Sequence, residues 1–125
     1  GLHHLDLPSL RRLRDLTRRF TLRVMVGRHA LEILAFALAA GFGEELLFRG
    51  VLMPWLVSSL GTIPGVVVLS AAFAACHALT PVYALLSFLG SLAFCDMMLL
   101  SGGNLAVPSL AHAFYDFIAI QYTLW

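Results

Sequence analysis

Ionisable side chains occur in three short groups inside otherwise apolar stretches of the 125-residue chain. The groups are Glu44-Glu45 with Arg49, His77 with Phe73 four residues before it, and His112 with Asp116. Ionisable residues are costly within apolar spans, so they are functional candidates there. Carboxylates and imidazoles are also the groups that enzymes use to activate water or to bind zinc. The pattern therefore indicates hydrolytic chemistry.

The first group divides its residues between two roles. Glu45 and Arg49 are one helical turn apart, in the order that favours an ion pair, and we interpret this pair as structural. Glu44 points about 100° away on the same helix and has no partner within its own segment. Glu44 is therefore the candidate general base.

The other two groups supply imidazoles. His112 and Asp116 share one helix face, so they can orient each other, position a water molecule or bind a metal together. Taken alone, His77 would be typical of a hydrogen-bonded core histidine. Each of the other two groups, taken alone, would be typical of a helix-stabilising pair. Three such groups in so short an apolar chain favour one shared site of Glu44, His77, His112 and Asp116.

Two forms of chemistry remain open for this site. Glu44, His77 and His112 form the ligand set of a hydrolytic zinc centre with an open position for water. The same side chains can activate water without a metal, with His112 and Asp116 stabilising an oxyanion. Spacing does not choose between Zn²⁺ and a metal-free site. Asp96 lies near the end of a separate apolar run, and we place it outside the site.

The composition indicates where these groups reside. The chain is 60% apolar and 12% charged, with a mean hydropathy of +0.88. Soluble domains are about 45–50% apolar and about 25% charged. The composition excludes a disordered chain, and two cysteines exclude a disulfide framework. We expect an all-α, polytopic transmembrane helix bundle.

Four apolar segments are candidate spans, because a span needs about 20 mostly apolar residues. They are residues 30–60, 62–79, 82–100 and 105–125. The first is too long for one straight crossing, so we expect it to tilt, protrude or bend, with residues 41–43, Gly50 and Pro54 as candidate bends. Gly61 and Gly65 are small enough to allow close helix contacts.

The N-terminal segment is strongly basic. Seven of the eight cationic residues, all arginines, precede the first candidate span. Apolar residues recur there every three or four positions, which predicts an amphipathic helix from Pro8-Ser9. We therefore divide the chain into a basic juxtamembrane segment, 1–29, suited to anionic headgroups, and a transmembrane core, 30–125. The charge bias places the N-terminus in the cytoplasm. The surrounding apolar sequence argues against a nucleic-acid partner.

The three motifs, in this order over residues 40–117, resemble the CAAX-protease and bacteriocin-processing family of intramembrane proteases. That family includes the Ras-converting CAAX endopeptidases and bacterial immunity-type (Abi) homologues. The strings GEELLFRG at 43–50 and AHA at 111–113 are also similar to those of the family. The resemblance implies a multi-pass protein, here of a bacterial-type cytoplasmic membrane, with a peptide or protein substrate. A prenylated C-terminus is one substrate class of the family.

The resemblance also implies residue roles. Glu44 would activate water with His77, and Glu45 with Arg49 would be structural. His112 and Asp116 would bind the oxyanion or hold a metal. Eukaryotic prenyl-protein proteases often have Asn where this chain has Asp116, and an ionised Asp does not donate to an oxyanion. Family members also commonly carry additional helices before the Glu-Glu segment, so this chain is expected to represent a catalytic core.

The leading hypothesis is an intramembrane endopeptidase. The first alternative is a non-catalytic membrane immunity or interaction protein whose polar cluster only stabilises the bundle. The second is a proton or ion carrier, because chains of Asp, Glu and His also serve as relays. Loss of peptide cleavage in variants of Glu44, His77 and His112 distinguishes the first hypothesis from both alternatives.

Overall fold

The computed structural model describes residues 8–124, and every regular element in this range is helical. In chain order the elements are α1 (Pro8–Met25), α2 (Ala30–Glu45), the π-helical stretch η2 (Leu46–Leu52), α3 (Met53–Leu60), α4 (Thr62–Cys76), α5 (Pro81–Leu100) and α6 (Ala106–Leu124). The all-α prediction is confirmed for this part of the chain.

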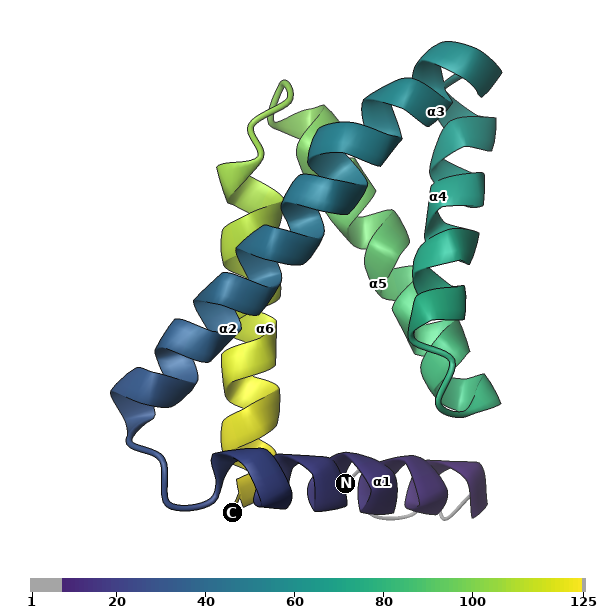
Figure 1. Cartoon of the computed structure of the whole chain (residues 1–125). Helices are drawn as coiled ribbons and strands as arrows, with labels where there is room; N and C mark the ends of the chain where they lie inside the picture. The colour runs from purple at the N-terminus through teal and green to yellow at the C-terminus, as the bar shows by residue number, and fades with distance from the viewer. Residues whose placement is uncertain (1–7, 125) are drawn as a thin grey trace.

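The helices form two inclined pairs with α1 lying across one end (Figure 1). α2, η2 and α3 follow one another without a break, and α2 packs along α6. α4 returns beside α3 and packs against α5. α1 contacts α5 and α6. The two pairs diverge toward the end where α1 lies (Figure 1).

Close backbone approaches explain two glycines. A Cβ atom on Gly41 would lie 2.8 Å from the backbone nitrogen of Ala113, so only glycine lets α2 pack this closely on α6. A Cβ atom on Gly65 would lie 2.8 Å from the backbone nitrogen of Val57. The close helix contact expected at Gly65 is therefore present, between α4 and α3. Gly41, expected as a bend site, lies in regular helix and serves a helix contact instead.

The long first segment changes its helical geometry near its centre. η2 contains Gly50, one of the expected bend positions, and the Met53 amide donates to the Phe48 carbonyl five residues earlier. Pro54 follows η2 without a break, so its missing N–H leaves one carbonyl of the preceding turn without its helical hydrogen bond. The irregularity is thus a widened helical turn that contains Gly50 and ends beside Pro54.

An apolar core joins the middle of this long segment to α4 and α5. Its buried members are Phe48, Met53, Val66, Leu69, Phe73 and Cys95. Phe48 and Phe73 meet edge to face, with ring centroids 5.0 Å apart, a favoured geometry for aromatic pairs. This core fixes the relative positions of η2 and the C-terminal half of α4, which carry two of the polar groups.

The predicted segment 62–79 ends as a helix at Cys76, three residues early. Its end is set by Thr80 and Pro81, because a residue before proline disfavours helical geometry. Thr80 is extended, with φ −141° and ψ 159°, and its hydroxyl accepts from the Tyr83 amide to cap α5. His77 consequently lies at the C-terminal boundary of α4 and not within a helical turn.

Among residues 8–124, one helix, Pro81–Leu100, is both long and apolar enough to cross a membrane. Thr62–Cys76 is apolar but shorter. The segment 82–100 thus matches its predicted span, whereas the four-span topology stays a prediction. The boundary of segments 1–29 and 30–125 also stays a prediction.

Candidate functional site

The Glu45–Arg49 pair lies at the centre of the bundle. Both side chains are fully buried, and Arg49 Nη1 lies 3.2 Å from Glu45 Oε1. Arg49 Nη2 donates to the backbone oxygen of Ser91 at 2.9 Å and to its hydroxyl at 2.6 Å. The guanidinium carbon lies 4.9 Å from the centre of the Phe73 ring, within cation–π range. Arg49 therefore connects η2 to α4 and α5.

Glu45 also orients one imidazole of the site. Its Oε1 lies 2.8 Å from Nδ1 of His112, so a single carboxylate oxygen accepts from both Arg49 and His112. Phe94 of α5 stacks on His112 with centroids 4.9 Å apart and planes 10° apart. The hydrogen bond and the stacked ring together hold the buried His112 in one orientation.

His77 is oriented by its own helix. Its Nδ1 lies 2.7 Å from the Phe73 carbonyl oxygen, and the Phe73 ring stacks on it at 4.2 Å. A carbonyl oxygen only accepts, so Nδ1 carries the proton that is donated. Nε2 of His77 is then left facing away from α4, toward the side chain of Glu44.

The two imidazoles converge on Glu44. Its Oε2 lies 3.6 Å from His77 Nε2 and 3.4 Å from His112 Nε2. The Glu44 side chain is 38% exposed, compared with 0% for Glu45. The neighbouring carboxylates therefore differ: Glu45 is sealed in the core, whereas Glu44 is accessible.

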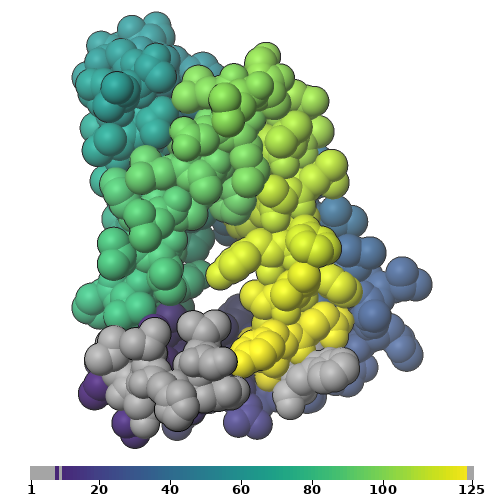
Figure 2. Space-filling model, turned by 180° about the vertical axis from the view of Figure 1, so that it is seen from behind, coloured from purple at the N-terminus to yellow at the C-terminus, as the bar shows by residue number. Residues whose placement is uncertain are grey.

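Asp116 completes the group from the next turn of α6. Its Oδ2 lies 3.5 Å from His112 Nε2, and its side chain is 25% exposed. The structure thus brings together Glu44, His77, His112 and Asp116, and their chemical roles stay predictions. Asp96 is exposed on α5 and is not among the side chains that the structure brings to this group. Seen from behind, an opening separates part of α5 (green) from α6 (yellow) (Figure 2).

The geometry of the site bears on the zinc prediction. Within residues 8–124, no group of three or more His, Cys, Asp or Glu side chains is arranged to hold a metal ion. The Nδ1 atoms of both imidazoles already donate to protein oxygens, which leaves one nitrogen on each ring for the site. Dependence on Zn²⁺ stays a prediction that metal removal tests.

Two residues of the site were not singled out by the sequence patterns. Ser91 binds Arg49, and Phe94 stacks on His112. Both lie on α5, in a run where their residue types are unremarkable. Ser91 and Phe94 are three residues apart and so lie near one face of α5. This spacing was the one feature of the sequence that could have linked them to the site. The contact of Glu45 with His112 was also not predicted.

Searches of curated proteins and of solved structures returned no match to the chain. A family model described as type II CAAX prenyl endopeptidase Rce1-like matches residues 27–118. That family consists of membrane-embedded proteases, which implies a peptide or protein substrate. The match begins before α2, ends within α6 and includes all the site residues described above. Because it covers most of the chain, the protein belongs to the type II CAAX prenyl endopeptidase Rce1-like family.

Proposed function

We propose that this protein is an intramembrane endopeptidase in which Glu44 activates the attacking water. The observation that supports the proposal is the convergence of His77 Nε2 and His112 Nε2 on Glu44 Oε2, at 3.6 and 3.4 Å. These separations exceed good hydrogen-bond length, so the three atoms are close neighbours that a water molecule could contact together. The group would then hold one water on three sides.

The orientation of each imidazole restricts its role. His77 donates from Nδ1 to the Phe73 carbonyl, so the neutral ring presents an unprotonated Nε2 that accepts from the water. His112 donates from Nδ1 to Glu45, and the Glu45 carboxylate stabilises a doubly protonated His112. In that form Nε2–H of His112 is a donor to an oxyanion. His77 is thus suited to hold the attacking water, and His112 is suited to stabilise the oxyanion.

The proposed reaction has two steps. Glu44 removes a proton from water, the hydroxide oxygen bonds to the carbonyl carbon, and the carbonyl oxygen becomes an oxyanion. The oxyanion faces Nε2–H of His112, and Asp116 is a second donor to it only in its protonated form. Glu44 then gives its proton to the amide nitrogen as the C–N bond breaks. The products are a new carboxyl terminus and a new amine. Glu45 and Arg49 position His112 and do not contact substrate.

The proposal includes a membrane arrangement. α5 has 20 residues and, at 1.5 Å per residue, spans about 30 Å, the thickness of a bilayer's hydrocarbon core. We propose that 30–60, 62–79 and 105–125 cross with it, with the N-terminus in the cytoplasm. Family membership supports a peptide or protein substrate, and we propose a prenylated C-terminus as the class to test first.

Glu44→Gln tests the proposal, because it keeps the shape of the side chain and removes the base. We expect peptide cleavage by the purified full chain to fall about 10²- to 10⁴-fold. The matched control is Glu32→Gln, at the exposed first turn of the same helix, which should cleave at the wild-type rate. Equal cleavage by Glu44→Gln and wild type would favour the alternative in which the polar cluster only stabilises the bundle.

A further inference from the structure

The helix α1 lies across one end of the bundle and passes the end of α6 (Figure 1). It packs against α5 and α6, and Thr21 and Met25 are its buried residues. α5 is the helix long and apolar enough to span a membrane, and its N-terminal end lies toward α1 (Figure 1). α1 is therefore placed where a membrane surface would meet the bundle.

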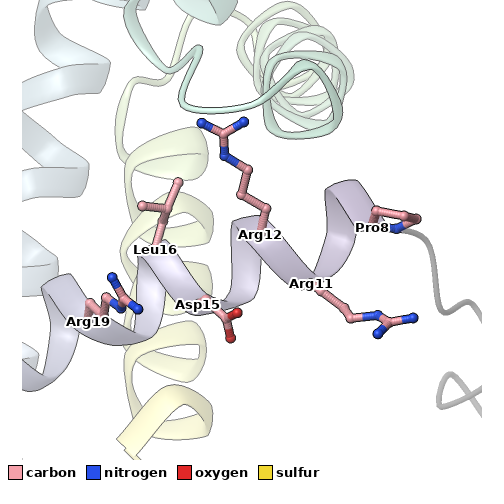
Figure 3. A pocket seen from close by; sticks show the side chains of 6 residues that line it. All are labelled: Pro8, Arg11, Arg12, Asp15, Leu16 and Arg19. Atoms are coloured by element: carbon pink, nitrogen blue, oxygen red, sulfur yellow. The ribbon is translucent and has the colours of Figure 1, made fainter.

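The exposed surface of α1 carries both apolar side chains and arginines. Leu16, Phe20 and Val24 are exposed at 38, 62 and 38%, and they follow one another at four-residue spacing. Figure 3 shows Leu16 and Arg12 pointing to the side on which the bundle stands, whereas Asp15 points away. An apolar and a cationic side chain of α1 therefore both face the side on which the bundle stands.

An open surface depression of about 520 Å³, which we call the hollow, lies along this helix alone among the described elements. It is lined by Pro8, Arg11, Arg12, Asp15, Leu16 and Arg19 (Figure 3). Arg12 and Arg19 are exposed and seven residues, or two turns, apart on one side of the helix. Guanidinium groups bind phosphate oxygens in bidentate fashion. Leu16 lies between the two arginines and supplies an apolar wall.

We propose that this hollow binds the phosphate of one anionic phospholipid. The phosphate lies between Arg12 and Arg19, and the acyl chains leave along Leu16 toward the bundle. The apolar wall and the position of α1 favour a lipid over a free phosphate, which has no apolar part to bury. The proposal goes beyond the proposed function and beyond the net charge of the segment, because it assigns binding to two arginines out of seven.

The test measures lipid-dependent stability of the purified full chain. Phosphatidylglycerol is titrated into phosphatidylcholine–detergent micelles, and the rise in Tm gives the lipid's half-saturation concentration. Each arginine near an anionic lipid contributes about 1 kcal/mol. Arg12→Gln with Arg19→Gln should therefore raise that concentration roughly thirtyfold. Both side chains are exposed, so the fold should be retained, and circular dichroism checks the helix content.

The matched control removes the same charge elsewhere. Arg14→Gln with Arg28→Gln changes two exposed arginines that do not line the hollow, and it should raise half-saturation much less than the first double variant does. Equal weakening in both double variants would show general charge attraction and overturn the site. An equal rise in Tm with inorganic phosphate alone would assign the site to a free anion and overturn the lipid. If Arg12→Gln with Arg19→Gln binds the lipid as wild type does, the proposed site is also overturned.

Discussion

Arg49→Leu removes the cation from the buried pair and leaves an apolar side chain of moderate size. Wild-type Arg49 contacts Glu45 Oε1 at 3.2 Å and donates twice to Ser91. After the substitution, Glu45 remains fully buried and keeps its hydrogen bond with His112. The variant should therefore be much less stable than wild type.

The size of the effect follows from the burial of the pair. Removing one partner of a buried ion pair costs about 3–5 kcal/mol, because the other charge remains uncompensated. The exposed fraction of both side chains is 0%, so little screening by solvent reduces this cost. At about 4 °C per kcal/mol for a chain of this length, the Tm should fall by about 12–20 °C.

The assay is thermal unfolding in detergent micelles, with a second variant to separate charge from packing. Glu45→Met with Arg49→Leu removes both charges, so it should recover most of the lost stability. It should still cleave poorly, because His112 loses the carboxylate that orients it. Arg18→Gln, at an exposed position of α1, is the control and should unfold at the wild-type temperature. A double variant no more stable than Arg49→Leu would refute the reasoning.

Three further outcomes are expected. Gly41→Ala should destabilise the protein, because its Cβ would meet the Ala113 backbone at 2.8 Å. Gly43→Ala should not, because the space around its Cβ is open. The Tm values of the two variants test this difference. Asp116→Asn should cleave within about tenfold of wild type, because an amide can donate to an oxyanion, whereas Asp116→Ala should lose about 10²-fold or more in kcat; equal losses would assign the ionised carboxylate to orienting His112. Chelation, with metal removal verified by metal analysis, should leave the cleavage rate unchanged if side chains alone activate water. Loss of cleavage on chelation and its recovery on addition of Zn²⁺ would contradict this mechanism.

The sequence was most informative about contacts within one helix. The spacing of four between Glu45 and Arg49, and between His112 and Asp116, predicted pairs that the structure contains at 3.2 and 3.5 Å. Helical periodicity determines these distances with no knowledge of the fold. The boundaries of α5 and α6 followed from their flanking Thr-Pro and Gly-Gly-Asn sequences within one or two residues.

Contacts between helices were not predictable in the same way. Periodicity assigns a residue to a helix face but does not say which neighbour covers that face. The approach of His112 to Glu45, 67 positions apart, depends on how α2 packs on α6. That packing depends on Gly41, whose Gly-Phe-Gly context indicates a bend when read from the sequence alone. The contribution of α5 through Ser91 and Phe94 was missed for the same reason.

The π-helical turn has a consequence for changes in chain length. A helix that pairs Met53 with Phe48, five residues back, contains one residue more than an α-helix would need there. Deleting an exposed residue such as Leu47 would restore ordinary pairing and leave both flanking faces in register. Elsewhere in the same helix, one deletion turns everything beyond it by about 100°. Homologues whose helix is one residue shorter should therefore have the deletion between Glu45 and Met53. In those homologues the four-residue spacing of Glu45 and Arg49 should be lost.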